Sequence, residues 1–178
     1  TNLLNLEIKG VKPFTRVLPD SSELPIPLIS KIFDSKSLYE GKKSSQNIIV
    51  EFFDYNCSYC KRAHKDLKQI INEKKNIKVI YKNFPILSEN SVKLAKYALI
   101  ISELDEAKFV KFHNYILKQK GKINDNDLNL IFRELDFEKA DLDKRLNDDS
   151  INLKLQNDYD LANELGLRGT PAFVLGDE

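Results

Sequence analysis

The hydrophobic positions in the first half of the chain predict a strand, a helix and a second strand in close succession. Residues 47–53 form a nearly continuous apolar run with β-branched and aromatic side chains, typical of a strand buried on both faces. From residue 57 to about 74, apolar positions recur at helical spacing and charged residues occupy the other face. Residues 77–81 supply the second strand. Strand, helix and strand within about 35 residues are typical of a right-handed parallel crossover unit.

Between residues 88 and 166 the pattern predicts helices only. The expected helices have apolar positions at helical spacing and are separated by breakers such as Gly121. They cover residues 92–101, 106–117, 127–135, 140–146 and 151–165. Gly166 is a natural end for the last of these helices, and a strand-like run follows at residues 172–175.

Residues 1–43 have no single clear pattern. Leu4, Leu6 and Ile8 alternate as in a strand, but prolines recur between residues 13 and 27. We therefore expect this region to be an arm or an early edge strand.

Composition narrows the classes of function. With 178 residues and 42% apolar composition, the chain can bury a core as one domain, or as one domain with an insertion. Lys and Arg number 28 against 27 Asp and Glu, so bulk charge gives no support for a nucleic-acid partner. No apolar run approaches the roughly 20 residues of a membrane helix, and the sequence does not start like a signal peptide. We expect no nucleic-acid partner and no membrane insertion.

The only two cysteines, Cys57 and Cys60, are spaced C-x-x-C directly after the first predicted strand. Two cysteines are too few for a disulfide-stapled scaffold, so this placement indicates a redox-active dithiol. Cys57 is expected in the first turn of the helix, where unpaired backbone N–H groups and the positive end of the dipole favour a thiolate. A thiolate attacks disulfides, and Cys60 lies one turn further along, where it can resolve the mixed disulfide formed by Cys57.

Two other uses of these cysteines stay open. Cys57, Cys60 and His64 would form a zinc or copper site, although a tetrahedral site needs a fourth ligand and the sequence offers only the remote His113 or carboxylates. We interpret His64 as a surface residue and His113 as a helix-packing residue. Alternatively, the chain is a binding domain in which the Cys57–Cys60 disulfide is inert.

Three segments resemble the DsbA-like thiol-disulfide oxidoreductases of the thioredoxin superfamily. They are EFFDYNCSYCK at 51–61, FPIL at 84–87 and GLRGTPAFV at 166–174. The resemblance covers roughly residues 44–178 and implies an α/β, thioredoxin-like fold with an inserted all-helical domain.

The resemblance also implies a division of the chain. The thioredoxin-like domain is expected at residues 44–88 and 167–178, the helical insertion at 89–166, and the N-terminal arm at 1–43. The family's fold continues after this point with another strand and a closing helix, which the printed sequence does not include.

Roles for three further residues follow from the same resemblance. Pro171 is expected to be cis and to lie against the C-x-x-C pair, with Thr170 presenting backbone groups to an extended substrate segment; otherwise it is an ordinary trans-proline. Glu51 occupies the place of a buried acid beneath the dithiol. A carboxyl group inside an apolar strand should have a raised pKa, and it would accept the proton of Cys60 through water. The alternatives are that Glu51 points to a sheet edge or pairs with a lysine.

The residues around the cysteines set the redox character. Ser58 and Tyr59 would contact substrate, and neither is cationic, whereas strongly oxidising family members carry a histidine between the cysteines. A moderate stabilisation of the thiolate is expected, as in the isomerase and reductase branches. Lys61 and Arg62 would raise the thiolate population or attract acidic substrates, although charges in the first turns of a helix are usually only solvated. Asp54 is interpreted as a turn or cap residue.

The expected function is therefore that of an enzyme that forms, reduces or isomerises disulfides in cysteine-containing protein substrates. It would need a redox partner that reoxidises or re-reduces the dithiol, and no cofactor. The family implies a periplasmic or otherwise extracytoplasmic bacterial setting. The direction of the reaction and the oligomeric state stay open.

Overall fold

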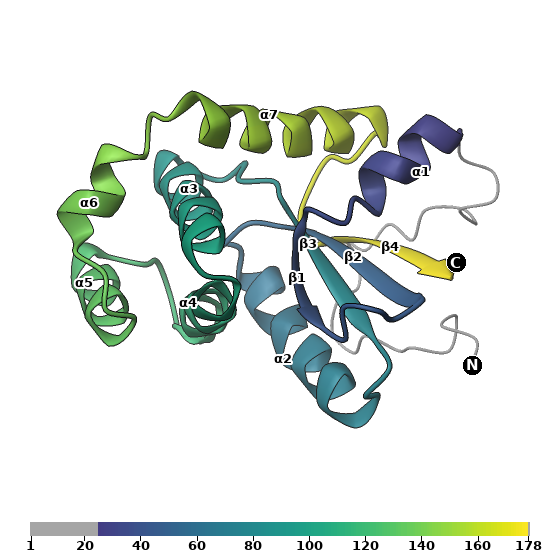
Figure 1. Cartoon of the computed structure of the whole chain (residues 1–178), viewed down its shortest axis with the longest axis horizontal. Coiled ribbons are helices and arrows are strands. Elements are labelled where there is room, and N and C mark those ends of the chain that lie inside the picture. Colours follow the sequence, from purple (N-terminus) through teal and green to yellow (C-terminus); the bar gives the residue numbers. More distant parts are fainter. Residues whose placement is uncertain (1–24, 178) are drawn as a thin grey trace.

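A four-stranded mixed sheet forms the centre of the protein in the computed structural model, which describes residues 25–177 (Figure 1). The strands are β1 (Leu38–Gly41), β2 (Asn47–Phe53), β3 (Lys78–Asn83) and β4 (Ala172–Asp177). Their order is β1-β3-β2-β4. The two inner strands, β2 and β3, are parallel, and each outer strand is antiparallel to its neighbour. The predicted apolar run at 47–53 is thus an inner strand.

The helix α2 (Ser58–Glu73) connects β2 to β3, which confirms the predicted crossover unit. Five more helices separate β3 from β4, and each predicted helix is present. They are α3 (Glu89–Leu104), α4 (Glu106–Lys118), α5 (Asp125–Glu134), α6 (Lys139–Lys144) and α7 (Asp149–Glu164). The helix α3 begins three residues earlier than predicted because Ser88 caps it and accepts a hydrogen bond from the Ser91 amide. The exact division into domains stays a prediction.

Each face of the sheet is covered by its own set of helices. Alternate side chains along a strand point to opposite faces. Ile49 and Phe53 of β2 therefore join the core shared with α2, α3 and α4, whereas Val50 and Phe52 join the core shared with α7. Figure 1 shows α7 on one side of the sheet and α2 on the other. Glu51 falls on the same face as Ile49 and Phe53, beneath α2.

The N-terminal region contains more structure than predicted. The helix α1 (Ile26–Ile32) precedes β1, and its Ile32 is buried in the core on the α7 side. Prolines at the start of this helix do not prevent it, because the first helical N–H groups have no partner inside the helix. The strand β1 lies at the edge of the sheet, 30 residues after the alternation from which an early edge strand was expected. The alternation of Leu4 to Ile8 lies outside the described residues.

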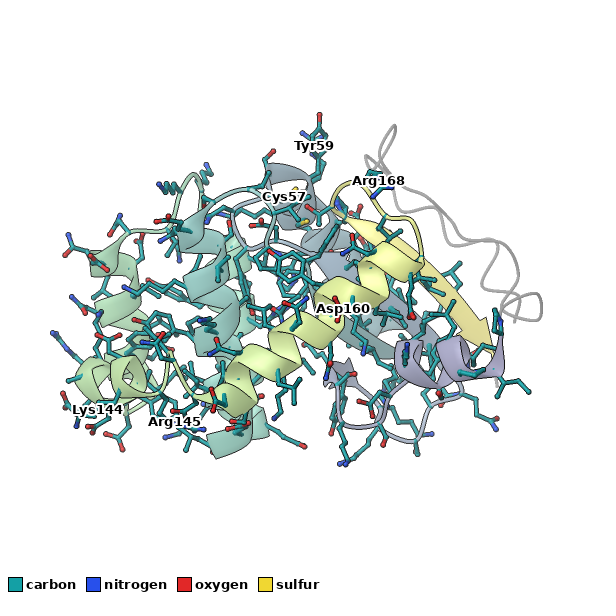
Figure 2. All side chains as sticks on the ribbon, turned by 90° about the horizontal axis from the view of Figure 1, so that it is seen from above. Cys57, Tyr59, Lys144, Arg145, Asp160 and Arg168 are labelled. Carbon is teal, nitrogen blue, oxygen red and sulfur yellow. The ribbon has the colours of Figure 1, made fainter. Side chains whose placement is uncertain are left out.

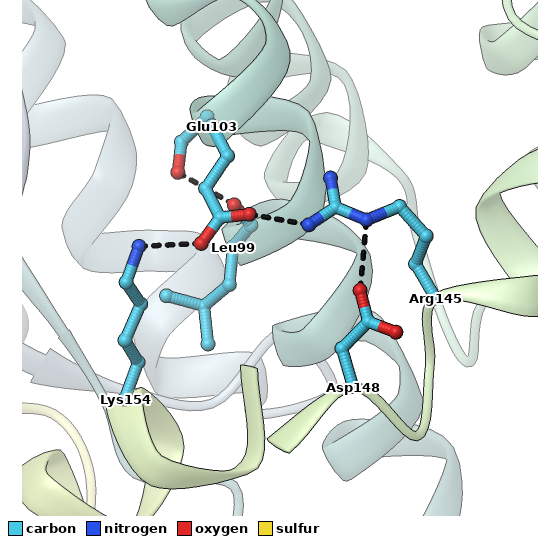
Figure 3. Close-up of polar contacts among 6 residues, drawn as sticks. Leu99, Glu103, Arg145, Asp148 and Lys154 are labelled. Atoms are coloured by element: carbon cyan, nitrogen blue, oxygen red, sulfur yellow. Dashed lines mark hydrogen bonds and ion pairs between the residues drawn. The ribbon is translucent and has the colours of Figure 1, made fainter. Parts of the chain in front are cut away.

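A network of ion pairs joins α3 to the region around α6 and α7 (Figure 3). The Glu103 carboxylate accepts hydrogen bonds from Lys154 Nζ at 2.6 Å and from the Arg145 guanidinium. Arg145 Nε also donates to Asp148 at 2.9 Å. Networks of several charges hold geometry better than isolated surface pairs, so this one holds the C-terminal end of α3 against the start of α7.

Replacement of Gly41 tests how closely the chain packs at the edge of the sheet. Gly41 has a φ of +95°, and a Cβ there would lie 2.4 Å from the Ile77 carbonyl oxygen. Gly121 has a φ of +76° but no atom within 4 Å of its Cβ position. Gly121→Ala should therefore lower the free energy of unfolding by about 1–2 kcal/mol, the cost of a left-handed backbone. Gly41→Ala should lower it by roughly 1–3 kcal/mol more, because of overpacking. Urea unfolding measures both; equal losses would contradict the clash.

Candidate active site

The two cysteines lie where β2 passes into α2. Cys57 is the N-cap of α2, one residue before the helix rather than inside its first turn. Its sulfur accepts a hydrogen bond from the Cys60 backbone N–H at 3.5 Å, in the place that a serine or aspartate oxygen takes in ordinary caps. Both cysteines are free thiols; Cys60 is fully buried, while Cys57 keeps 6% of its surface exposed. Figure 2 shows Cys57 at the same end of the molecule as Tyr59 and Arg168.

Asp54 holds the turn that carries the cysteines, as the sequence predicted. Its carboxylate accepts hydrogen bonds from the backbone N–H groups of Asn56 at 2.8 Å and Leu87 at 3.0 Å. Its carbonyl oxygen accepts the Cys57 N–H at 3.0 Å. One buried aspartate therefore ties the segment after β3 to the C-x-x-C turn.

The surroundings of Cys57 favour its thiolate. The hydrogen bond between the Cys60 thiol and the Cys57 sulfur does most to lower the pKa of Cys57, which falls from 9.0 to about 6. Partial burial opposes this shift, and Thr170 and the backbone N–H groups of Cys60 and Tyr59 assist it. Burial raises the pKa of Cys60, and the hydrogen bond with Cys57 and the Glu51 charge raise it further. At neutral pH the pair therefore holds one thiolate, on Cys57, and one thiol.

The Thr170–Pro171 peptide bond is cis, as the resemblance implied. Thr170 lies two residues before the start of β4, and the Cys57 sulfur lies 3.4 Å from the Thr170 carbonyl oxygen. The segment that opens β4 thus lies beside the reactive sulfur. Ser58 and Tyr59, the two residues between the cysteines, open α2 and are exposed.

Glu51 is buried in the middle of the sheet. It lies opposite Tyr81 of β3 and Phe173 of β4, and its side chain has no exposed surface. Within residues 25–177, neither carboxylate oxygen has a hydrogen-bond partner. Burial raises the pKa of Glu51 well above 4.5, and the nearby Cys57 charge raises it further. The alternatives that Glu51 points to a sheet edge or pairs with a lysine are therefore wrong.

The prediction that His64 lies on the surface is wrong, because His64 is buried. Its exposed fraction is 1%, and its ring centroid lies 5.5 Å from that of His113. The helix α4 covers this side of α2, which the residue pattern of α2 does not reveal. Burial lowers the pKa of His64 to about 4, with help from the charges of Lys68 and Lys118, so the ring is neutral. His113 is buried within the helix packing, as predicted.

The described part of the chain does not support the metal alternative. Among residues 25–177, no group of three or more His, Cys, Asp or Glu side chains is arranged to hold a metal ion. His64 instead packs its ring against His113.

Among residues 25–177, no helix combines the length and apolarity needed to cross a membrane.

Two contacts from the helical region support the cysteine turn, and the sequence analysis missed both. Asn56 Nδ2 donates to Asn90 Oδ1 at 2.9 Å, at the start of α3. The Tyr55 hydroxyl lies 3.0 Å from His113 Nδ1 on α4. These partners are 34 and 58 residues apart in the sequence, so no local spacing signals them.

Comparison with known protein families shows the family to which the chain belongs. Residues 48–178 match the family model described as the DSBA-like thioredoxin domain. The chain belongs to this family. A DSBA-like protein has an α/β, thioredoxin-like fold with a helical insertion, which confirms the predicted fold class.

Solved structures of similar proteins agree with the DSBA-like assignment. The thiol-disulfide exchange protein alpha-DsbA2 from Wolbachia pipientis is 35% identical, with 85% of this chain and 82% of that chain covered and a TM-score of 0.77. A periplasmic thioredoxin-like protein from Salmonella enterica serovar Typhimurium is 26% identical, with 88% and 87% covered and a TM-score of 0.77. Among curated relatives, the Na(+)/H(+) antiporter NhaA 1 of Salinispora arenicola is 23% identical over 90% of this chain. The chain spans 24% of that protein's length.

The pKa of Cys57 predicts the pH dependence of its alkylation in this DSBA-like protein. Because the lowered pKa leaves a thiolate above about pH 6, the rate of reaction of the reduced protein with iodoacetamide should rise with a midpoint near 6. A free cysteine titrates near about 8.5. Cys60→Ala should move the midpoint upward, because the Cys60 hydrogen bond is the largest cause of the shift. Cys57→Ala is the control and should lose the fast reaction. An unchanged midpoint in Cys60→Ala would contradict this origin of the shift.

The unpartnered Glu51 carboxyl group predicts that the folded protein becomes less stable as pH rises. Its pKa is higher in the folded than in the unfolded protein, so the folded state loses stability as pH rises through the folded pKa. Glu51→Gln should therefore raise the free energy of unfolding of the reduced protein by about 1–3 kcal/mol at pH 8. The gain should shrink towards pH 4.5. Glu40→Gln is the matched control: Glu40 pairs with Lys68, so its replacement should not stabilise the protein. Urea unfolding at both pH values measures these differences, and a gain independent of pH contradicts the assignment.

Proposed function

We propose that this DSBA-like protein is a thiol-disulfide oxidoreductase that acts on cysteine-containing proteins through Cys57 and Cys60. The observation that carries the proposal is the asymmetry of the pair. Cys57 keeps 6% of its surface exposed and has a pKa lowered to about 6, whereas Cys60 is fully buried and its pKa is raised. A pair of this kind has one sulfur that exchanges with outside partners and one that resolves the product.

In the oxidising direction, a substrate thiolate attacks Cys57 of the disulfide form. The Cys57–Cys60 bond breaks, a bond forms between the substrate sulfur and Cys57, and Cys60 leaves as a thiolate that takes up a proton. A second substrate thiolate then attacks the substrate sulfur, and Cys57 leaves as a thiolate. Two electrons pass from the substrate to the protein. Reduction of a substrate disulfide is the reverse sequence, begun by the Cys57 thiolate.

The ionisation of Cys57 bears on which direction is favoured. A stabilised thiolate stabilises the reduced protein and makes its disulfide a stronger oxidant. The pKa of about 6 lies between those of thioredoxin, about 7, and DsbA, about 3.5. We therefore place this pair as more oxidising than thioredoxin and less oxidising than DsbA. The absence of a cation at Ser58 and Tyr59 is consistent with an intermediate character.

Glu51 is proposed as the group that exchanges the Cys60 proton. Its burial, its raised pKa and the effect of its charge, which raises the pKa of Cys60, support this role. A carboxyl group whose pKa is raised well above its usual range can both accept and return a proton, here through an intervening water. Glu51 acts on the resolving step and not on the first attack by Cys57.

Substrate contact is assigned to the surface on either side of Cys57. The Thr170 carbonyl oxygen lies next to the sulfur, and Thr170 and Pro171 lead into β4, which supports a role as a platform for an extended substrate segment. Ser58 and Tyr59 are exposed at the start of α2, where an approaching chain would meet them.

The cycle requires a redox partner that restores the Cys57–Cys60 pair after each turnover. We further propose a periplasmic or otherwise extracytoplasmic location, supported by the similar periplasmic protein from Salmonella. Disulfides persist in such oxidising compartments.

Equilibration with glutathione tests the proposed activity. The fraction of reduced protein, measured after acid quenching and thiol labelling, should give a reduction potential between about −270 and −120 mV. The oxidised protein should also oxidise a dithiol peptide stoichiometrically, and Cys57→Ala, the control, should not. A potential at or below that of thioredoxin would refute the oxidising assignment. A Cys57–Cys60 disulfide that neither glutathione nor the peptide reduces would refute the enzyme.

A further inference from the structure

A pocket of about 370 Å³ lies beside the C-x-x-C turn, lined by three segments that are distant in the sequence. Ser58 and Lys61 contribute from the start of α2, and Leu87 contributes from the segment after β3. Gly121 and Lys122 contribute from the loop between α4 and α5. The Lys61 ammonium group donates to the Gly121 carbonyl oxygen and so holds this loop against α2. The pocket therefore forms only where the helical insertion meets the C-x-x-C turn.

Two basic side chains reach this pocket. Lys61 and Lys122 line it, and no acidic residue does. The carboxylates of Asp54 and Asp127 lie close enough to Lys61 for their charges to act upward on its pKa, so they offset the charge of this lysine. Within the described residues, Lys122 is exposed and takes part in no ion pair. The uncompensated positive charge at this pocket is therefore that of Lys122.

Apolar surface surrounds the same opening. Leu87, which lines the pocket, is 55% exposed, and the adjacent Ile86 is 42% exposed. Tyr59 is 37% exposed beside Cys57, with the Arg62 guanidinium over its ring. A surface with large apolar side chains around two lysines complements a segment that is both apolar and acidic.

We propose that this pocket binds acidic side chains of the substrate, and that the enzyme therefore prefers cysteines flanked by Asp or Glu. The inference rests on the proposed function and adds to it the class of substrate. Lys61 lies about one helical turn, roughly 6 Å, from Cys57. An extended substrate rises about 3.3 Å per residue, so the acidic side chain should be two or three residues from the reacting cysteine. This site is separate from the proposed platform at Thr170, which would bind the substrate backbone and would not distinguish charged from neutral side chains.

Two matched dithiol peptides test the preference. They are identical except that positions two and three on either side of one cysteine carry Glu in one peptide and Gln in the other. Each rate of oxidation by the disulfide form is divided by the rate of the same peptide with hydroxyethyl disulfide, which removes the effect of Glu on the peptide's own thiols. The corrected rate should be at least about fivefold higher for the Glu peptide at 0.1 M salt. The ratio should fall towards one at 1 M salt, where the screening length shortens from about 10 Å to about 3 Å.

Reversal of a single charge tests whether the preference for Glu arises at the pocket. Lys122→Glu should bring the Glu-to-Gln ratio to one or below. Lys144→Glu is the control, because it makes the same change in net charge on α6, far from Cys57 (Figure 2). It should keep the wild-type ratio. Circular dichroism verifies that both variants fold.

The outcomes separate this inference from the proposed function. If wild-type protein oxidises both peptides at equal corrected rates, the acidic preference is refuted while the oxidoreductase stands. If both variants lower the Glu-to-Gln rate ratio equally, the preference depends on the net charge of the protein, and the role of the pocket is refuted. If neither peptide is oxidised, the proposed function fails and the preference fails with it.

Discussion

The hydrogen bond between the two thiols is the interaction on which this site depends. The backbone N–H of Cys60 holds the Cys57 sulfur at the N-terminus of α2, and the Cys60 thiol lowers the pKa of Cys57 most, so the negative charge of the pair collects on Cys57. Cys60, by contrast, is enclosed by the core and resists ionisation. A difference in burial between two identical side chains thus assigns them different chemical roles. The helix supplies this difference directly, because residues three apart lie one turn apart along its axis.

The buried carboxyl group of Glu51 lowers the stability of the protein beneath the cysteine pair. Its carboxyl group lies in an inner strand beneath the dithiol without a hydrogen-bond partner in the described residues, and the negative charge of Cys57 disfavours its ionisation. Two ionisable groups that interact in an apolar space titrate as a coupled system, so the protonation of Glu51 depends on the redox state above it. A purely stabilising core would carry an apolar residue at this position. The cost in stability of the buried acid is consistent with its proposed use in proton exchange.

The helical insertion completes the site as well as covering it. Its first helix anchors the cysteine turn through Asn56 and Asn90, and α4 reaches the same turn through Tyr55 and His113. The loop after α4 then supplies Lys122 to the pocket beside Cys57. The sheet and α2 therefore carry the sulfur chemistry, while the insertion adds charge and shape around it. A change of sequence in the insertion can alter substrate preference without touching the cysteines.

The sequence alone determined those features that depend on neighbours within a few residues. The apolar run at 47–53, the helical spacing after Cys57 and the position of the cysteines at their junction are local, and each predicted element was found close to its expected bounds. The family motif added the cis bond before Pro171. Only the tertiary structure decided the burial of His64, the isolation of Glu51 from any lysine, and the meeting of Lys61 with Lys122. The physical reason is that periodicity reports which side of a helix is apolar but not which distant helix covers its polar side. A histidine suits either a solvated or a packed position, and only the packing of α4 against α2 selects between them.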